Sequence, residues 1–79
     1  MKQAPDTVIK NLGKRLRLLR QETGLSQEAF ADNVGMDRTY ISGIERGRLN
    51  PSLRNIARIA AELNVNIAVL FGCSGRCIR

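Results

Sequence analysis

Apolar residues recur every three or four positions along most of this chain, which is the spacing of an α-helix. Between Asp6 and Arg20 they form one stripe: Val8, Ile9, Leu12, Leu16 and Leu19. The other faces of the same segment carry basic residues: Lys10, Lys14, Arg15, Arg17 and Arg20. The pattern predicts an amphipathic first helix that begins near Asp6 and ends at Gly24, a residue suited to a C-terminal cap.

Two short helices are expected next. Ser26 can cap a second helix over residues 27–34, and Asp37 can cap a third from about Arg38 to Arg46. The inner positions of both helices are small or apolar: Phe30, Ala31, Val34, Ile41 and Ile44.

Two more helices complete the pattern. Pro51 in the loop RLNPS opposes continuation of the third helix, and Ser52 can cap a fourth helix over residues 53–63. A fifth helix around Ile67–Phe71 is apolar on too many sides for a surface element, so it is either a core lid or a dimer contact. The wide apolar face of the fourth helix consists of Leu53, Ile56, Ala57, Ile59, Ala60 and Leu63. The expected fold is all-α, with five helices and no strand; one domain over residues 6–72 lies between a loose arm, residues 1–5, and a short tail, residues 73–79.

The second and third helices, from Gln27 to Gly47, have the spacing of a helix-turn-helix. Gly35 can adopt the positive φ that ends one helix and begins a sharp turn. Ala31 supplies the small residue that two steeply crossing helices need where their backbones meet. Because the third helix opens with polar side chains, the segment predicts a helix that enters a DNA groove.

Length and charge agree with this prediction. The chain has 79 residues and a formal net charge of +6, with a sequence pI of about 10.4. Such a length predicts one small domain, and the excess of Lys and Arg predicts attraction to phosphate polymers. A basic surface that serves only solubility is the alternative, and the helix-turn-helix favours DNA. The sequence has no secretory signal and no long apolar run, so we expect a cytoplasmic protein with no membrane partner.

The residues that most enzymes use are scarce. The chain has no histidine, which excludes a Ser-His-Asp triad, a Cys-His pair and a histidine metal site. Cys73 and Cys77 lie in CSGRC, and two thiols alone do not complete a tetrahedral zinc site. A disulfide, a redox sensor and reduced thiols are all open for this pair, with reduced thiols favoured in the cytoplasm. We expect no enzyme activity, no metal and no cofactor.

The first turns of the third helix hold the candidates for base reading, since that end of a recognition helix enters the major groove. Arg38 can pair with O6 and N7 of guanine, a contact that discriminates bases by about 1–3 kcal/mol. Ser42 lies one turn beyond Arg38 on the same face, and Thr39 offers a hydroxyl and a methyl group. Tyr40 and Gly43 lie beside them, and Gly43 would let the groove wall come close. The alternative is that Arg38 and Thr39 are only an exposed first turn.

Polar residues around these helices are candidates for phosphate contacts: Gln27, Arg46, Arg48, Asn50 and Arg54. Gln27 opens the second helix, where backbone N–H groups already favour an anion. For the other four, a solvated surface side chain is an equal alternative. Glu45 shares the inner face of the third helix, where an unpaired carboxylate is costly, so we expect a structural ion pair with Arg20.

The segment GKRLRLLRQETGLSQEAFADNVGMDRTYISGIERGRLNPSLRNIARIAAELNV resembles the lambda-repressor-like, Xre/Cro-type DNA-binding domain, and the similarity covers residues 12–71. Its specific elements are R-x-x-x-G-L-S-Q over residues 20–27, Ala31, Gly35, and I-x-x-I-E-x-G over residues 41–47. The stretch DRTYISGIERG is similar to the controller proteins of restriction–modification systems, which are small dimeric regulators. The end of this chain soon after its fifth helix agrees with such stand-alone regulators.

The resemblance implies a five-helix bundle that binds a two-fold operator in double-stranded DNA as a homodimer. It assigns base reading, phosphate binding and the internal ion pair to the residues named above. The matching dimer interface is in the fifth helix: Ile67, Val69, Leu70 and Phe71. Many relatives carry an acidic residue before the Leu-Phe, and NIAVLFG lacks it, which makes this surface more apolar.

RNA polymerase is a further partner that the resemblance implies. Acidic residues on the second helix of the lambda repressor touch the polymerase, and the matching positions are Glu28 and Asp32. A solvated acidic patch is the alternative there. The expected function is a sequence-specific transcription regulator of bacterial or phage origin, a repressor that can also activate. An antitoxin-like protein-interaction module with secondary DNA binding is the alternative, favoured only by the apolar fifth helix and the cysteine tail.

Overall fold

A computed structural model describes residues 4–71, which form five α-helices and no strand. The helices are α1 (Pro5–Thr23), α2 (Gln27–Val34), α3 (Arg38–Glu45), α4 (Leu53–Leu63) and α5 (Ile67–Leu70). The predicted all-α class and the order of five helices are confirmed. The first helix begins one residue earlier than predicted, because Ala4 is the N-cap of α1 and Pro5 is its first residue. Pro suits that position since the first helical N–H has no partner within the helix.

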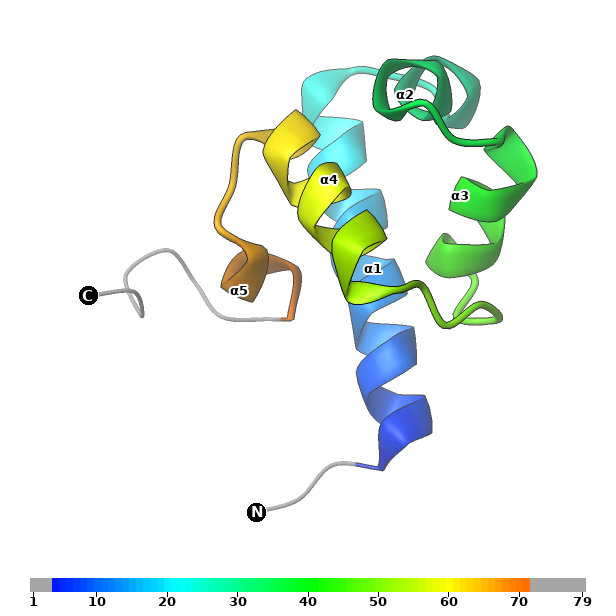
Figure 1. Ribbon diagram of the computed structural model, residues 1–79, viewed down its shortest axis with the longest axis vertical. Helices are drawn as coiled ribbons and strands as arrows, with labels where there is room; N and C mark the ends of the chain where they lie inside the picture. Colours follow the sequence, from blue (N-terminus) through cyan, green and yellow to red (C-terminus); the bar gives the residue numbers. More distant parts are fainter. Residues whose placement is uncertain (1–3, 72–79) are drawn as a thin grey trace.

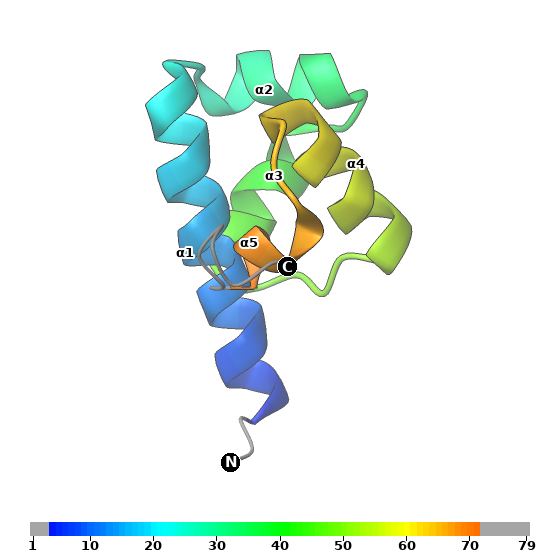
Figure 2. The same cartoon turned by 90° about the vertical axis from the view of Figure 1, so that its left-hand side faces the viewer.

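The long helix α1 is the axis around which the others are arranged (Figure 1). It packs against α3, α4 and α5, while α2 packs against α3 and α4. Figure 2 shows α2 running across the C-terminal end of α1. In Figure 1 α3 and α5 lie on opposite sides of α1, and in Figure 2 α5 lies in front of α3, so the helix-turn-helix and the fifth helix belong to different faces of the molecule.

Capping residues mark several of the helix ends. The Ser26 and Ser52 hydroxyls accept hydrogen bonds from the backbone N–H groups of Ala29 and Asn55, which caps α2 and α4 as predicted. Gly24 ends α1 in the left-handed conformation. Asp37 differs from the prediction: it occupies the N-cap position of α3 but makes no capping hydrogen bond.

Within residues 4–71 the buried core consists of aliphatic side chains and one aromatic, Phe30. Its buried residues are Leu12, Leu16, Phe30, Ala31, Val34, Ile41, Ile44, Ile56, Ile59, Ala60, Leu63 and Leu70. The apolar face of α4 is narrower than predicted, because Leu53 and Ala57 are exposed. Leu53 is 68% exposed since it lies in the first turn of α4, where neighbouring helices no longer cover it. No helix within residues 4–71 is long and apolar enough to cross a membrane.

A close backbone contact seats α3 on α1, and its residue was not singled out from the sequence. Gly13 is buried in the middle of α1. A Cβ atom added there would lie 2.9 Å from the carbonyl oxygen of Glu45 and closer still to that of Ile44. Only glycine therefore lets α1 approach the C-terminal end of α3 so closely.

Candidate nucleic-acid interface

The turn between α2 and α3 is closed by backbone hydrogen bonds at Gly35. Gly35 has φ +73°, and the N–H of Met36 donates to the carbonyl of Ala31 at 2.9 Å. This is the chain reversal that the sequence predicts, with a glycine where the left-handed conformation is required. Ile41 and Ile44 are fully buried below the turn, so the opposite face of α3 is left for polar side chains.

That polar face forms a cleft of about 270 Å³. Its lining residues are Arg38, Thr39, Ser42, Gly43, Arg46 and Arg48. Three arginines and two hydroxyl-bearing residues therefore line one concave surface, and no Asp or Glu is among its lining residues. The arginine fork suits paired acceptors such as guanine O6 and N7 or phosphate oxygens. The structure thus brings together residues predicted separately for base reading and for phosphate contact.

Tyr40 is not part of this cleft. Its side chain is half-buried, and its hydroxyl accepts a hydrogen bond of 2.9 Å from Nδ2 of Asn55 on α4. The contact fixes the distance between α3 and α4 near the exposed surface. The role of Asn55 was missed in the sequence, because nothing local distinguishes it from an ordinary polar residue in the first turn of a helix.

The hydroxyl of Thr39 is held by a neighbour on the same helix. Its Oγ1 donates to the carboxylate of Asp37. Since an ionised carboxylate only accepts hydrogen bonds, the direction of this bond is fixed. The Thr39 oxygen therefore turns acceptor lone pairs, and not a proton, toward the cleft.

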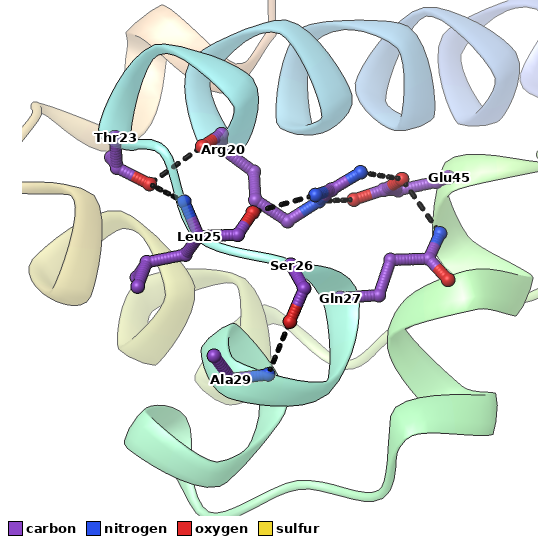
Figure 3. Close-up of polar contacts among 7 residues, drawn as sticks. All are labelled: Arg20, Thr23, Leu25, Ser26, Gln27, Ala29 and Glu45. Carbon is purple, nitrogen blue, oxygen red and sulfur yellow. Dashed lines mark hydrogen bonds and ion pairs between the residues drawn. The ribbon is translucent and has the colours of Figure 1, made fainter.

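Below the cleft, a polar network joins α1, α2 and α3 (Figure 3). The Arg20 guanidinium donates to both carboxylate oxygens of Glu45, from Nε at 2.6 Å and from Nη2 at 3.1 Å. Its Nη1 donates to the carbonyl of Leu25 at 2.8 Å. The side chains of Arg20 and Glu45 are 10% and 3% exposed, so this ion pair is largely shielded from water. Its two charges are compensated by charge-assisted hydrogen bonds.

Gln27 belongs to the same network, which changes the interpretation of this residue. Its Nε2 donates to Oε1 of Glu45 at 2.9 Å. A glutamine amide has two N–H groups, so one remains for a phosphate at the start of α2. The network thereby fixes the orientation of the amide that was expected to contact DNA.

The remaining phosphate candidates are more dispersed. Asn50 and Arg54 are exposed in the loop after α3 and in the first turn of α4, and neither lines the cleft. Arg48 does line it, because its backbone N–H donates to the carbonyl of Gly43 at 2.9 Å and folds the loop back along α3. Gly43 does not offer an open approach to a groove wall as expected, since the side chain of Leu49 covers it.

The surface predicted for dimerisation needs a correction. Leu70 is fully buried in the core of its own chain, so it is not part of an exposed interface. Ile67 and Val69 are half-buried, and Phe71 is 45% exposed. The Val69 carbonyl accepts a hydrogen bond of 3.3 Å from Nε of Arg15, which ties α5 to α1. With α5 thus fixed by Leu70 on its inner side, Phe71 is the large side chain that it exposes.

The remaining predicted residues are the acidic pair on α2 and the two cysteines. Glu28 and Asp32 are both exposed on α2. The carboxylates within residues 4–71 form no cluster that could hold a metal ion. Cys73 and Cys77 lie outside the described residues, so the structure adds nothing to the expectations for them.

Comparison with known proteins gives the family. The helix-turn-helix family HTH_3 matches residues 16–70. The control protein C.MunI of a Mycoplasma species is 48% identical over 60 residues, which are 75% of this chain and 81% of that protein. The ImmF control region 10 kDa protein of Bacillus phage phi105 is 43% identical over 61 residues, covering 77% of this chain and 68% of its own length.

Solved structures agree with these relatives. The restriction-modification controller protein C.AhdI from Aeromonas hydrophila has a TM-score of 0.77 and 46% identity, over 80% of this chain and 96% of that one. This chain belongs to the helix-turn-helix family, in its lambda-repressor-like, Xre/Cro-type branch.

Proposed function

We propose that this protein binds a two-fold operator in duplex DNA as a homodimer and regulates transcription from that site. The observation that carries the proposal is the cationic cleft on α3. Its three arginines and two hydroxyl-bearing residues come from the exposed face of α3, the second helix of a helix-turn-helix, and from the segment that directly follows it. A helix of this kind fits the major groove, where base edges and phosphates are within reach of one face.

The parts of the cleft have different tasks in this proposal. Arg38, in the first turn of α3, reads a guanine, while Thr39 and Ser42 contact neighbouring bases. Arg46 and Arg48 bind backbone phosphates, and together with Gln27 they set the register of α3 in the groove. Asn50 and Arg54 extend the phosphate contacts along the backbone.

Dimerisation through α5 is supported by the apolar surface that this helix exposes. Phe71 is 45% exposed, and Ile67 and Val69 beside it are half-buried. The helix lies on the opposite side of α1 from α3 (Figure 1). Two chains joined there by a two-fold axis present two recognition helices, which reach successive major grooves when they are about 34–36 Å apart.

The regulatory outcome depends on where the operator lies. A dimer over a promoter represses transcription by excluding RNA polymerase. A dimer just upstream activates it if Glu28 and Asp32, both exposed on α2, touch the polymerase. The double variant Glu28→Gln/Asp32→Asn should then lose activation in a purified transcription assay and keep its affinity for the operator. Unchanged activation would remove polymerase from the list of partners.

Selection of bound duplexes from a random library, at moderate salt, tests the proposal directly. We expect enrichment of a two-fold motif whose half-sites are about one helical turn apart. If no motif is enriched, the basic charge gives only non-specific attraction and the proposal fails.

The roles of single arginines are then separable. Arg38→Ala should relax base choice at one position of each half-site, with a loss of about 1–3 kcal/mol of discrimination there. Arg46→Ala should weaken binding to all sequences alike and reduce the salt dependence. Arg17→Ala is the matched control, because it removes the same charge from an exposed position on α1 outside the cleft.

A further inference from the structure

A half-buried glycine of α3, Gly43, is one of the residues that line the cleft, and a loop side chain occupies the space beside it. A Cβ atom added to Gly43 would lie 2.5 Å from Cδ1 and 2.7 Å from Cγ of Leu49. Both distances are far below van der Waals contact. The space that a side chain at position 43 would need is therefore occupied by Leu49, a residue of the loop between α3 and α4.

Leu49 is held from both sides. It is half-buried and packs against the hydrophobic core, while its outer atoms lie beside Gly43. Pro51, two residues further along the loop, is buried. The backbone N–H of Arg48 donates a hydrogen bond to the carbonyl of Gly43. A larger residue at position 43 therefore requires Leu49 either to turn its side chain or to move with the loop, and because Leu49 packs against the core, either change disturbs that packing.

This loop supplies one side of the cationic cleft. Arg48 lines the cleft together with Arg38 and Ser42, and it is the residue next to Leu49. The position of its backbone relative to α3 is set by the hydrogen bond to Gly43 and by the packing of Leu49 on the same residue.

We propose that Gly43 and Leu49 form a packing seat that positions Arg48 for a DNA phosphate. The two are positioning residues, since they act through Arg48 and not by contact with a base. The inference rests on the proposed function, because it concerns how the same cleft binds DNA.

We expect Gly43→Ala to favour the helical conformation of α3 and to disturb the arrangement of the cleft. Alanine is the stronger helix former, so in the absence of Leu49 the substitution would favour α3. With Leu49 in place, the new methyl group displaces the loop and moves Arg48 away from its phosphate. The loss should appear mainly in the electrostatic part of binding, while the base preference at the position read by Arg38 is kept.

The test is a double-mutant cycle on the selected operator duplex, with affinity measured over a range of salt concentrations. The four proteins are the wild type, Gly43→Ala, Leu49→Ala and the double variant. In the wild-type background Gly43→Ala should weaken binding about tenfold and lower the slope of log K against log salt by about 1 per protomer. In the Leu49→Ala background the same substitution should cost less than about twofold, because the overlap is gone.

Each other outcome overturns the inference in a recognisable way. An equal loss in both backgrounds means that the methyl group meets DNA directly and that the seat has no part in binding. An unchanged affinity and slope for Gly43→Ala means that the loop yields without moving Arg48. If Gly43→Ala does not fold, Leu49→Ala alone must lower the salt slope, and an unchanged slope is then decisive against the seat. A wild type that selects no motif is different, since it overturns the proposed function itself.

Discussion

The bond between Asp37 and Thr39 shows how one residue can decide what its neighbour presents to DNA. The Thr39 hydroxyl donates to the Asp37 carboxylate, which leaves acceptor lone pairs facing outward. In the major groove such an oxygen suits the exocyclic amino groups of adenine and cytosine. Guanine O6 and thymine O4 are acceptors and are disfavoured opposite it.

Replacement of Asp37 should therefore change base choice at a residue that it does not itself contact. In Asp37→Ala the Thr39 hydroxyl is released and can also donate, so preference for an amino-bearing base at that position should fall toward parity, a loss of about 1 kcal/mol of discrimination. The measurement is the ratio of affinities for operators that differ only at that base pair. Asp37→Asn removes the same negative charge as Asp37→Ala. Any general gain in affinity for DNA that results from the lost charge therefore occurs in both variants, and it cancels in the ratio of affinities for the two operators. A ratio that stays at its wild-type value in Asp37→Ala would show that Thr39 is oriented by something else.

At the scale of the helices, the contact that matters most for the site is the one between α1 and α3. Gly13 allows the backbones to meet at Glu45, and the ion pair of Arg20 with Glu45 lies on the same pair of helices. The recognition helix is thus aligned by a close backbone approach and by a buried polar network.

Gly13→Ala should be strongly destabilising although alanine favours helices. The added methyl group has nowhere to go except against two backbone carbonyls, which cannot rotate away as a side chain can. Overpacking of this kind costs about 1–3 kcal/mol in the free energy of unfolding, and a rigid backbone neighbour places it at the upper end. Urea denaturation measures the change, with Lys14→Ala, at the next and exposed position of α1, as the control. Equal stability of the two variants would mean that α3 sits farther from α1 than the structure has it.

The ion pair makes a second prediction at this scale. Arg20→Met leaves the Glu45 carboxylate buried with only Gln27 as a partner, which should cost about 3–5 kcal/mol of unfolding free energy. The double variant Arg20→Met/Glu45→Met should recover a good part of that loss, because no buried charge remains. Denaturant unfolding of both variants decides it. A double variant less stable than Arg20→Met would show that the pair stabilises the fold by attraction and not merely by mutual neutralisation.

The helices and their contacts also explain which features could be predicted from the sequence. Helix ends were predicted within about one residue because caps such as Ser26 and Ser52 are local signals. The members of the cleft on α3 were predictable too, since positions 38, 42 and 46 are four apart and share one helical face. Gly13 and Leu49 were not, because their roles depend on which distant backbone or helix approaches them. Leu70 was misassigned because α5 is about one turn long, and so short a segment has no periodicity that separates an inner face from an outer one.

On the scale of the whole molecule, two surfaces of different character lie on opposite sides of α1. The cationic cleft is on α3, and the exposed apolar side chain of Phe71 follows α5 (Figure 1). Separation of this kind lets a dimer form through one surface without obstructing DNA at the other. It also links the two, because the affinity of a dimer for a two-fold site combines the binding of both half-sites.

Phe71→Glu should therefore separate dimerisation from base reading. A carboxylate in place of an exposed apolar ring disfavours burial in an interface, so sedimentation equilibrium should show monomers at concentrations where the wild type is dimeric. Binding to the full operator should weaken by at least about 10²-fold, since each half-site is then bound on its own, while base preference within a half-site is unchanged. Leu18→Glu is the matched control: it makes the same change at a side chain that is 53% exposed on α1. If Phe71→Glu stays dimeric and Leu18→Glu does not, the interface lies on α1; if both bind the operator like the wild type, neither surface joins the protomers.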